Sequence, residues 1–240
     1  MAGKGSSVGG SNTSAPKSLN EQNRLSLWAV TLLNVIVFAV IMGVDPTPFS
    51  KLAGAWTFLP PAGFGSAVGL AIIVVINGLI DKTDKHRLVF WKWNNPLPGS
   101  QAYTVYAKED ERFTQDDVLT KLRDGLKGTE TERSKECEEI MASPAKQNDR
   151  WYHEVFQPMQ DKPAVQQAER SFLFASDYTA ISFLMLIVVG AAGYFVINSP
   201  VVWGLYCGAL VLQYLLVRWA ARNYGIETVK NAFADWLQKN

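Results

Sequence analysis

The sequence predicts an all-α membrane protein with four transmembrane helices and a helical cytoplasmic insert between the second and the third. Three observations lead to this fold class. The chain of 240 residues holds four long apolar runs, each close to the ~20 residues that cross a bilayer as a helix. None of these runs contains a charged residue or a histidine. The lysines and arginines gather in alternate segments between the runs, which is typical of multi-pass proteins.

The four apolar runs cover residues 25–44, 61–80, 178–197 and 201–217. Burying one ionised side chain at the centre of a bilayer costs about 2.5–3.5 kcal/mol, so the absence of charge favours membrane insertion. Four buried helices of a soluble protein are the alternative, but such helices normally carry a polar stripe that these runs lack. The first run is also too long for the apolar part of a cleaved signal peptide.

The positive charges orient the chain. Lys and Arg are frequent before the first run, between the second and third, and after the fourth, and they are scarce in the other two connections. This pattern places both termini and the long middle segment in the cytoplasm. The expected parts are a disordered N-terminal tail (1–24), a first transmembrane hairpin (25–81), an interfacial strap with a helical cytoplasmic domain (82–177), a second transmembrane hairpin (178–217) and an amphipathic C-terminal helix (218–240).

The insert, residues 82–177, opens on an aromatic and cationic stretch that directly follows the second run. Phe90, Trp91, Lys92 and Trp93 are its central residues. Trp side chains prefer the membrane–water interface, and lysines there reach toward the headgroups. We therefore expect an interfacial strap, with a groove for a partner protein as the alternative. Two prolines follow, and Pro98-Gly99 suits a type II turn that starts the cytoplasmic domain.

The rest of the insert has the pattern of several helices. Thr114 and Asp117 form a capping box that begins the first helix, and a charged second helix covers 130–141 until Ser143 and Pro144 stop it. Further helices are expected over 148–157 and 164–174, and residues 101–107 are expected to be extended. The insert has few large apolar residues, so we expect its core to be completed by packing against the strap, the C-terminal tail or another subunit.

Small and polar residues within the runs predict helix packing. Gly65 and Gly69, and likewise Gly204 and Gly208, are four apart, a spacing that lets helices approach closely in membranes. Asn34 and Asn77 lie deep in the first two runs, where an amide can bond between helices or line an aqueous path. Gln213 allows the same two interpretations.

Catalytic and metal-binding patterns are not found in the sequence. The glycine-rich segment 63–69 differs from a phosphate-binding loop in its spacing and lies in an apolar run. His153-Glu154 resembles the start of a zinc-protease motif, but position 157 is Gln. Cys137 and Cys207 form neither a disulfide framework nor a metal site. We expect no enzyme activity, cofactor or metal, and a net charge of +1 gives no reason to expect nucleic-acid binding.

Two segments carry a resemblance to known proteins. The residues FWKWNNPLPGSQA at 90–102, and the segment NDRWY at 148–152, resemble uncharacterised bacterial four-span inner-membrane proteins. The resemblance implies a location in the bacterial inner membrane. It implies no activity and assigns no functional residue.

The expected function follows from this organisation. We expect a non-enzymatic integral membrane protein that acts as an anchor, sensor or scaffold through its cytoplasmic helical domain. Its partners would be the lipid bilayer and a cytoplasmic protein, further copies of itself, or both. A channel or membrane-disrupting effector, for example in a bacterial antiviral response, is the alternative. The absence of charged residues in the runs argues against ion-driven transport but leaves a gated pore open.

Overall fold

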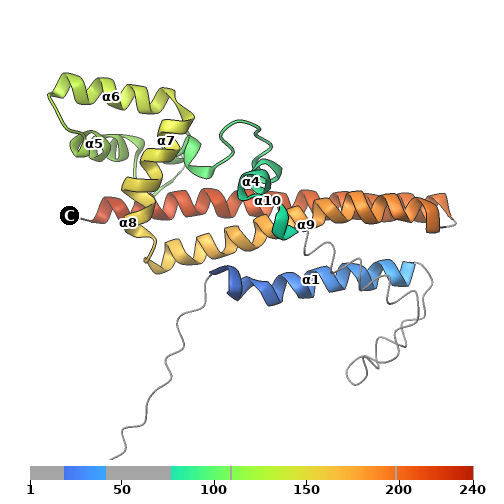
Figure 1. Cartoon of the computed structure of the whole chain (residues 1–240). Coiled ribbons are helices and arrows are strands. Elements are labelled where there is room, and N and C mark those ends of the chain that lie inside the picture. The colour runs from blue at the N-terminus through green and yellow to red at the C-terminus, as the bar shows by residue number, and fades with distance from the viewer. Residues whose placement is uncertain (1–18, 42–76, 109, 198, 240) are drawn as a thin grey trace, which may run out of the picture.

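The computed structural model describes residues 19–41, 77–108, 110–197 and 199–239. This part of the chain is all-helical and contains no strand (Figure 1). Of the first predicted hairpin, the structure describes helix α1 (Leu19–Ile41) and the end of the second run. Gly65 and Gly69 lie outside the described residues.

Two long antiparallel helices form the spine of the molecule (Figure 1). They are α9 (Pro163–Val196) and α10 (Pro200–Gln238), and both are long and apolar enough to cross a membrane by length and composition. Ser199 accepts a hydrogen bond from the backbone N–H of Val202 and caps α10, and Pro200 takes the first helical position. Near the same end, Trp203 Nε1 donates to the carbonyl of Gly190 at 2.9 Å and joins the two helices.

Both helices extend well beyond their apolar parts. At 1.5 Å per residue the 34 residues of α9 span about 51 Å and the 39 residues of α10 about 58 Å, against ~30 Å for the bilayer core. The helix expected over 164–174 is thus the first part of α9, and the C-terminal helix expected over 218–240 is the last part of α10. The apolar and charged segments are continuous helices without a break between them.

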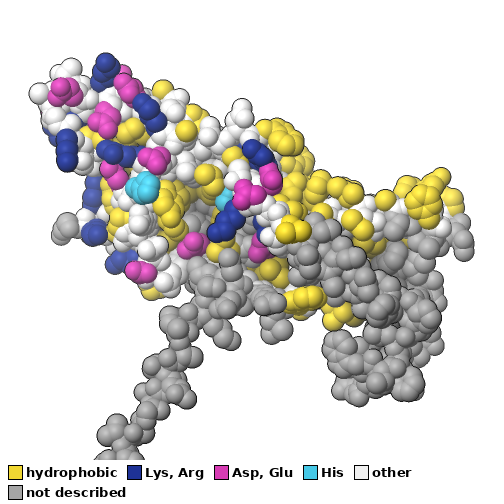
Figure 2. All heavy atoms as spheres, in the orientation of Figure 1, with side chains coloured by type: hydrophobic (Ala, Val, Ile, Leu, Met, Phe, Trp, Pro, Cys, Tyr) yellow, Lys and Arg dark blue, Asp and Glu magenta, His cyan; other side chains and the backbone are white. Residues whose placement is uncertain are grey.

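The insert packs against the charged half of this spine. Figure 2 shows charged side chains gathered over the insert and hydrophobic ones over the far end of α9 and α10. In chain order the insert contains the helix α4 (Lys82–Phe90), the 3₁₀ helices η1 (Pro98–Gln101) and η2 (Tyr106–Lys108), the helices α5 (Gln115–Gly125), α6 (Glu130–Ala142) and α7 (Pro144–Arg150), the π-helix η3 (Trp151–Phe156) and the short α8 (Gln157–Met159).

The core of the insert is completed by the end of α10. Val229 and Phe233 are fully buried among apolar residues of the insert such as Tyr103, Val118 and Leu122. The Phe233 ring meets the edge of Tyr103 at 5.3 Å between ring centroids. The expectation that the insert packs against the C-terminal tail is therefore confirmed.

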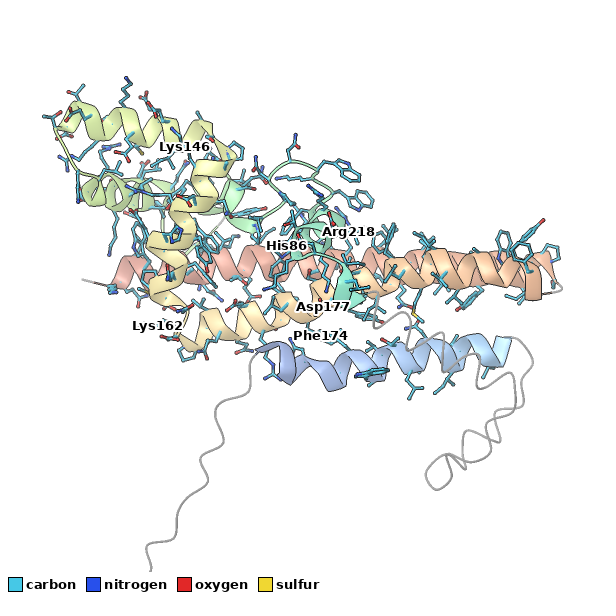
Figure 3. All side chains as sticks on the ribbon, in the orientation of Figure 1. His86, Lys146, Lys162, Phe174, Asp177 and Arg218 are labelled. Carbon is cyan, nitrogen blue, oxygen red and sulfur yellow. The ribbon has the colours of Figure 1, made fainter. Side chains whose placement is uncertain are left out.

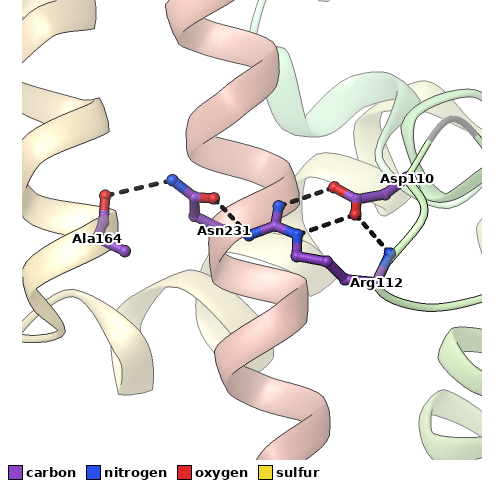
Figure 4. A network of polar contacts seen from close by, with 4 residues as sticks. All are labelled: Asp110, Arg112, Ala164 and Asn231. Atoms are coloured by element: carbon purple, nitrogen blue, oxygen red, sulfur yellow. Dashed lines mark hydrogen bonds and ion pairs between the residues drawn. The ribbon is translucent and has the colours of Figure 1, made fainter.

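A polar joint fixes the loop before α5 to both long helices (Figure 4). Arg112 donates to the Asp110 carboxylate and, at 2.9 Å, to the side-chain oxygen of Asn231 on α10. Asn231 in turn donates to the carbonyl of Ala164 at the start of α9 at 3.3 Å. Because Asn231 is buried, its amide links three segments where water has little access.

The helix boundaries follow from local chemistry. Thr114 and Asp117 form the expected capping box at the start of α5, and Thr129 and Glu132 form a second one at the start of α6. Ser143 ends α6 as expected. Its side chain also caps α7, which begins at the following proline rather than at 148.

Two sequence predictions for the start of the insert are wrong. Residues 101–107 form 3₁₀ helix and turns rather than an extended segment, because Tyr103 and Tyr106 are both buried in the core. Pro98-Gly99 begins the 3₁₀ helix η1 instead of a type II turn. Among the described glycines only Gly128 has a positive φ, which a type II turn would require at Gly99.

Candidate functional site

A cavity of about 720 Å³ lies where the apolar half of α9 meets its charged half. Its walls come from α1, the end of the second run (77–80), α4, the loop before η1, the segment from α7 to η3, α9 and, through Thr228, α10. Figure 3 shows His86 of α4 and Asp177 of α9 at this junction. The side chains that matter most for its chemistry are Asn77, Lys82, Lys85, His86, Trp151, Glu169 and Asp177. This volume is typical of pockets for small ligands.

One wall of the cavity is the contact between the two segments that carry the resemblance. Leu97 and Pro98 from the first segment, and Asn148 and Trp151 from the second, all line the cavity. A Cβ atom at Gly99 would lie 2.6 Å from Trp151 Cε3 and 2.7 Å from Asn148 Oδ1, so any larger residue would separate the segments. Glycine at 99 is therefore required by this close approach.

The second segment continues as the π-helix η3. This form is rare, and it occurs frequently at functional sites. In η3, Trp151 and Phe156 line the cavity and also belong to the core of the insert. Their ring centroids are 5.1 Å apart. The π-helix therefore connects the cavity wall to the insert core.

Two lysines and two carboxylates line the cavity, and only one lysine contacts a carboxylate. Lys85 Nζ lies 2.6 Å from Asp177 Oδ1, so these two side chains satisfy each other. Lys82 and Glu169 form no direct ion pair in the described part of the chain. Burial raises the pKa of the Glu169 carboxyl, and the positive charge of Lys82 opposes that shift. A cation and a carboxylate thus remain available for a polar ligand.

Three residues in the cavity wall hold a buried polar atom without a hydrogen-bond partner among the described residues. These atoms are Asn77 Oδ1, His86 Nδ1 and Trp151 Nε1. The His86 ring stacks on Phe172 with ring centroids 5.2 Å apart. Burial, together with the charge of Lys82, lowers the pKa of His86 to about 4, so the imidazole is neutral at pH 7. Buried unpaired polar groups are costly and normally find a partner.

The four residues of the expected interfacial stretch differ in how far they are exposed to solvent. Phe90 is buried against Phe172 and Ala221, whereas Trp91 and Trp93 are 60% and 80% exposed. Lys92 is partly buried, and this burial lowers the pKa of its ammonium group with help from Arg222. The two tryptophans are thus available to a membrane or a partner, and both interpretations stay predictions.

Trp91 also fixes the end of α4 to α10. It has a left-handed backbone with φ of 52° at the helix end, a conformation that costs ~1–2 kcal/mol for a residue with a Cβ. Its Nε1 donates to the hydroxyl of Tyr214 at 3.0 Å, and the Arg218 guanidinium lies 3.8 Å over its ring. These two contacts compensate for the backbone cost.

The predicted packing residues have different environments. Asn34 donates to the carbonyl of Val30 in its own helix at 2.8 Å, and Asn77 is buried in the cavity wall. Gly204 and Gly208 lie on an exposed face of α10, where an added Cβ would meet no atom within 4 Å. That these two glycines pack against a helix therefore stays a prediction, and it concerns contacts outside the described residues.

The close helix contacts that the structure shows involve other glycines. A Cβ at Gly193 would lie 3.1 Å from Trp203, and one at Gly225 would lie 2.9 Å from Phe90 Cζ. Gln213 donates to both the Tyr178 hydroxyl and the Ser182 hydroxyl at 3.2 Å, and so bonds α10 to α9.

The cavity itself was missed by sequence reasoning. Its charged residues come from segments more than 80 positions apart, such as Lys82 and Glu169. The two segments 90–102 and 148–152, which the sequence analysis singled out separately, both contribute to the wall. Among the described residues, no three His, Cys, Asp or Glu side chains are grouped closely enough to hold a metal ion.

Comparison with known proteins returns no match to a protein family, a curated protein or a solved structure. The site has to be interpreted from its own geometry, because no relative supplies a function or a residue role.

Proposed function

We propose that this protein is a non-enzymatic integral membrane protein of the bacterial inner membrane that acts as an anchor, sensor or scaffold through its insert. In this proposal the chain crosses the membrane four times and has both termini and the insert in the cytoplasm. A cytoplasmic protein, further copies of the chain, or both would bind to it.

The continuity of α10 is the observation that carries the proposal. One helix runs from an apolar segment into the core of the insert, where Val229 and Phe233 are fully buried. An insert held on a flexible linker would be free to rotate, whereas an insert built around the end of a spanning helix keeps a fixed orientation. A fixed orientation at the membrane surface is what an anchor or scaffold requires.

The polar residues of the long helices support a packed bundle over a pore. Gln213 is satisfied by Tyr178 and Ser182 on the neighbouring helix. Ser182 is buried, as is Thr179, which donates to the carbonyl of Ala175 in its own helix. Polar groups that are satisfied within and between packed helices stabilise a bundle, whereas pore-lining groups would face an open space.

Reporter fusions test the topology. We expect fusions after positions 20, 130 and 240 to report the cytoplasm, and fusions after 55 and 199 to report the opposite side, because Lys and Arg alternate between these segments. A cytoplasmic signal at 55 would refute the four-span topology.

The mass of the intact assembly, purified in mild detergent, tests the scaffold role. We expect a stable complex with a second protein. Phe233→Ala should release that protein while the chain stays in the membrane fraction, because Phe233 is buried in the insert core. Phe195→Ala is the matched control, since Phe195 is exposed at the far end of α9. A closed ring of this chain alone would favour the pore and would refute a scaffold for a second protein.

A further inference from the structure

We propose that the cavity between α1, α4, η3 and α9 binds one phospholipid whose headgroup carries both a phosphate and a primary ammonium group, as phosphatidylethanolamine does. Partner recruitment by the insert is a separate question, and the binding inference does not depend on it. It depends on the membrane location, which the lengths and composition of α9 and α10 support.

The cavity has the polarity of an amphiphile. Glu169 and Ile181 both line it and are twelve residues apart on α9, which is about 18 Å along the helix axis. Glu169 and Asp177 precede Ile181 on the same helix and bring two carboxylates to the lining. Leu27 of α1 packs with Ile181 at the start of the apolar segment. A ligand that fills the cavity therefore meets polar groups at one end and apolar groups at the other.

The charges favour a zwitterionic headgroup over an anionic one. Lys85 is already neutralised by Asp177 at 2.6 Å, which leaves Lys82 and Glu169 for the ligand. An anionic headgroup without a cation would pair with Lys82 but place a second negative charge near Glu169. A phosphate with a primary ammonium group matches both side chains, and charge-assisted hydrogen bonds of this kind are the strong ones.

The unpartnered atoms match the same headgroup. Trp151 Nε1–H can only donate, which suits a phosphate oxygen, and Asn77 Oδ1 can only accept, which suits an ammonium N–H. Asn77 is 7% exposed and Trp151 is 5% exposed, so bulk water is a poor substitute for a ligand at either side chain. A trimethylated ammonium has no N–H to donate, so phosphatidylcholine would leave Asn77 and Glu169 unsatisfied.

Lipid titration of the full-length protein in detergent tests the proposal, with native mass spectrometry as the readout. After removal of copurified lipid, we expect one phosphatidylethanolamine per chain, bound about tenfold more tightly than phosphatidylcholine or phosphatidylglycerol; tenfold corresponds to about 1.4 kcal/mol. Equal affinities for the three lipids, or tighter binding of phosphatidylglycerol, would overturn the proposal.

Glu169→Gln tests the headgroup contact. We expect the affinity for phosphatidylethanolamine to fall about tenfold and the affinity for phosphatidylcholine to fall less, because both headgroups lose the attraction of the charge and only the primary ammonium loses a charge-assisted hydrogen bond. Glu138→Gln is the matched control, since Glu138 is an exposed carboxylate on α6. An unchanged preference in Glu169→Gln would overturn the proposal.

Gly78→Phe tests the location. Gly78 lines the cavity, and a Cβ there would meet no atom within 4 Å, so a larger side chain can be introduced at the edge of the cavity without a clash at its Cβ. We expect the bound lipid to be lost. Gly125→Phe is the control, because Gly125 also has open space but lies on α5, away from the cavity. Retention of the lipid in Gly78→Phe would show that it binds elsewhere.

Discussion

Replacing Phe233 by alanine should detach the insert from the last part of α10. Phe233 is fully buried, and its ring makes edge contacts with Tyr103 at 5.3 Å and with Phe113 at 6.0 Å between centroids. Tyr103 and Phe113 belong to the insert and Phe233 to α10, so the substitution removes the centre of the interface between them.

The expected loss of stability can be estimated from this burial. Truncating a buried Phe to Ala costs about 3–5 kcal/mol, because the transfer energy is lost and a cavity remains. Each 1.4 kcal/mol is a factor of ten in an equilibrium constant, so the open form of the insert should become roughly a hundred to several thousand times more populated. The apolar ends of α9 and α10 should not change, because Phe233 lies far from them along the helix.

Hydrogen exchange in detergent measures this effect by segment. We expect faster exchange throughout α5, η3 and the last turns of α10, and unchanged exchange around Gly190 and Trp203, which are joined near the hairpin end. Phe195→Ala removes the same atoms from an exposed position and should leave the insert unaffected. Equal exchange of the insert in the two variants would refute the shared core.

Three further predictions follow from the junction and the spans. Replacing Trp93, which is 80% exposed, by Ala while Trp91 keeps its contacts with α10 should speed amide exchange over 94–106 without preventing membrane insertion, and unchanged exchange would reject the strap in favour of a partner groove. Lowering the pH from about 6.5 to about 4 should destabilise the fold by up to about 3 kcal/mol, because unfolding restores the pKa of His86 from about 4 to 6.5 and the unfolded chain binds the proton first. His86→Phe should flatten this part of the stability profile measured by denaturant unfolding. Replacing Gly65 and Gly69 together by Leu should lower thermal stability in detergent, and an unchanged melting temperature would place that face against lipid.

The elements set by local chemistry could be predicted from the sequence. The capping box of Thr114 and Asp117 marks the start of α5 because both of its hydrogen bonds lie within four residues. The third and fourth apolar runs lie in the two helices long and apolar enough to cross a membrane, because composition alone decides that property. Neither feature depends on how distant segments pack.

The absence of helix-breaking residues in the long helices is a sequence signal that hydropathy does not report. Between Pro163 and Gly190 there is neither proline nor glycine, so nothing ends the helix where its polarity changes. Dividing the chain by hydropathy placed a boundary near 178, although a helix continues across a change of side-chain polarity. No proline or glycine lies between Gly208 and Gly225, so residues 218–238 likewise continue the helix of the fourth run, and Gly225 does not end it.

Features that depend on distant contacts could not be predicted. Residues 101–107 include Tyr, Thr and Val, which are common in strands, but burial of both Tyr103 and Tyr106 selects a tighter 3₁₀ path. The π-helix depends on its tertiary setting, in which the Trp151 ring packs against Gly99, a residue more than 50 positions earlier. The cavity needs both of these features together with α1 and α9.

Trp151 links the two proposals physically. Its ring forms part of the cavity wall and of the insert core, where it packs on Phe156. A ligand that binds the folded protein and not the unfolded chain stabilises the fold by RT ln(1 + [L]/Kd). A phospholipid in the cavity would therefore stabilise the conformation of η3, and through it the insert that α10 holds at the membrane. If the protein is a sensor, occupancy of this cavity is the signal that its structure is best arranged to transmit.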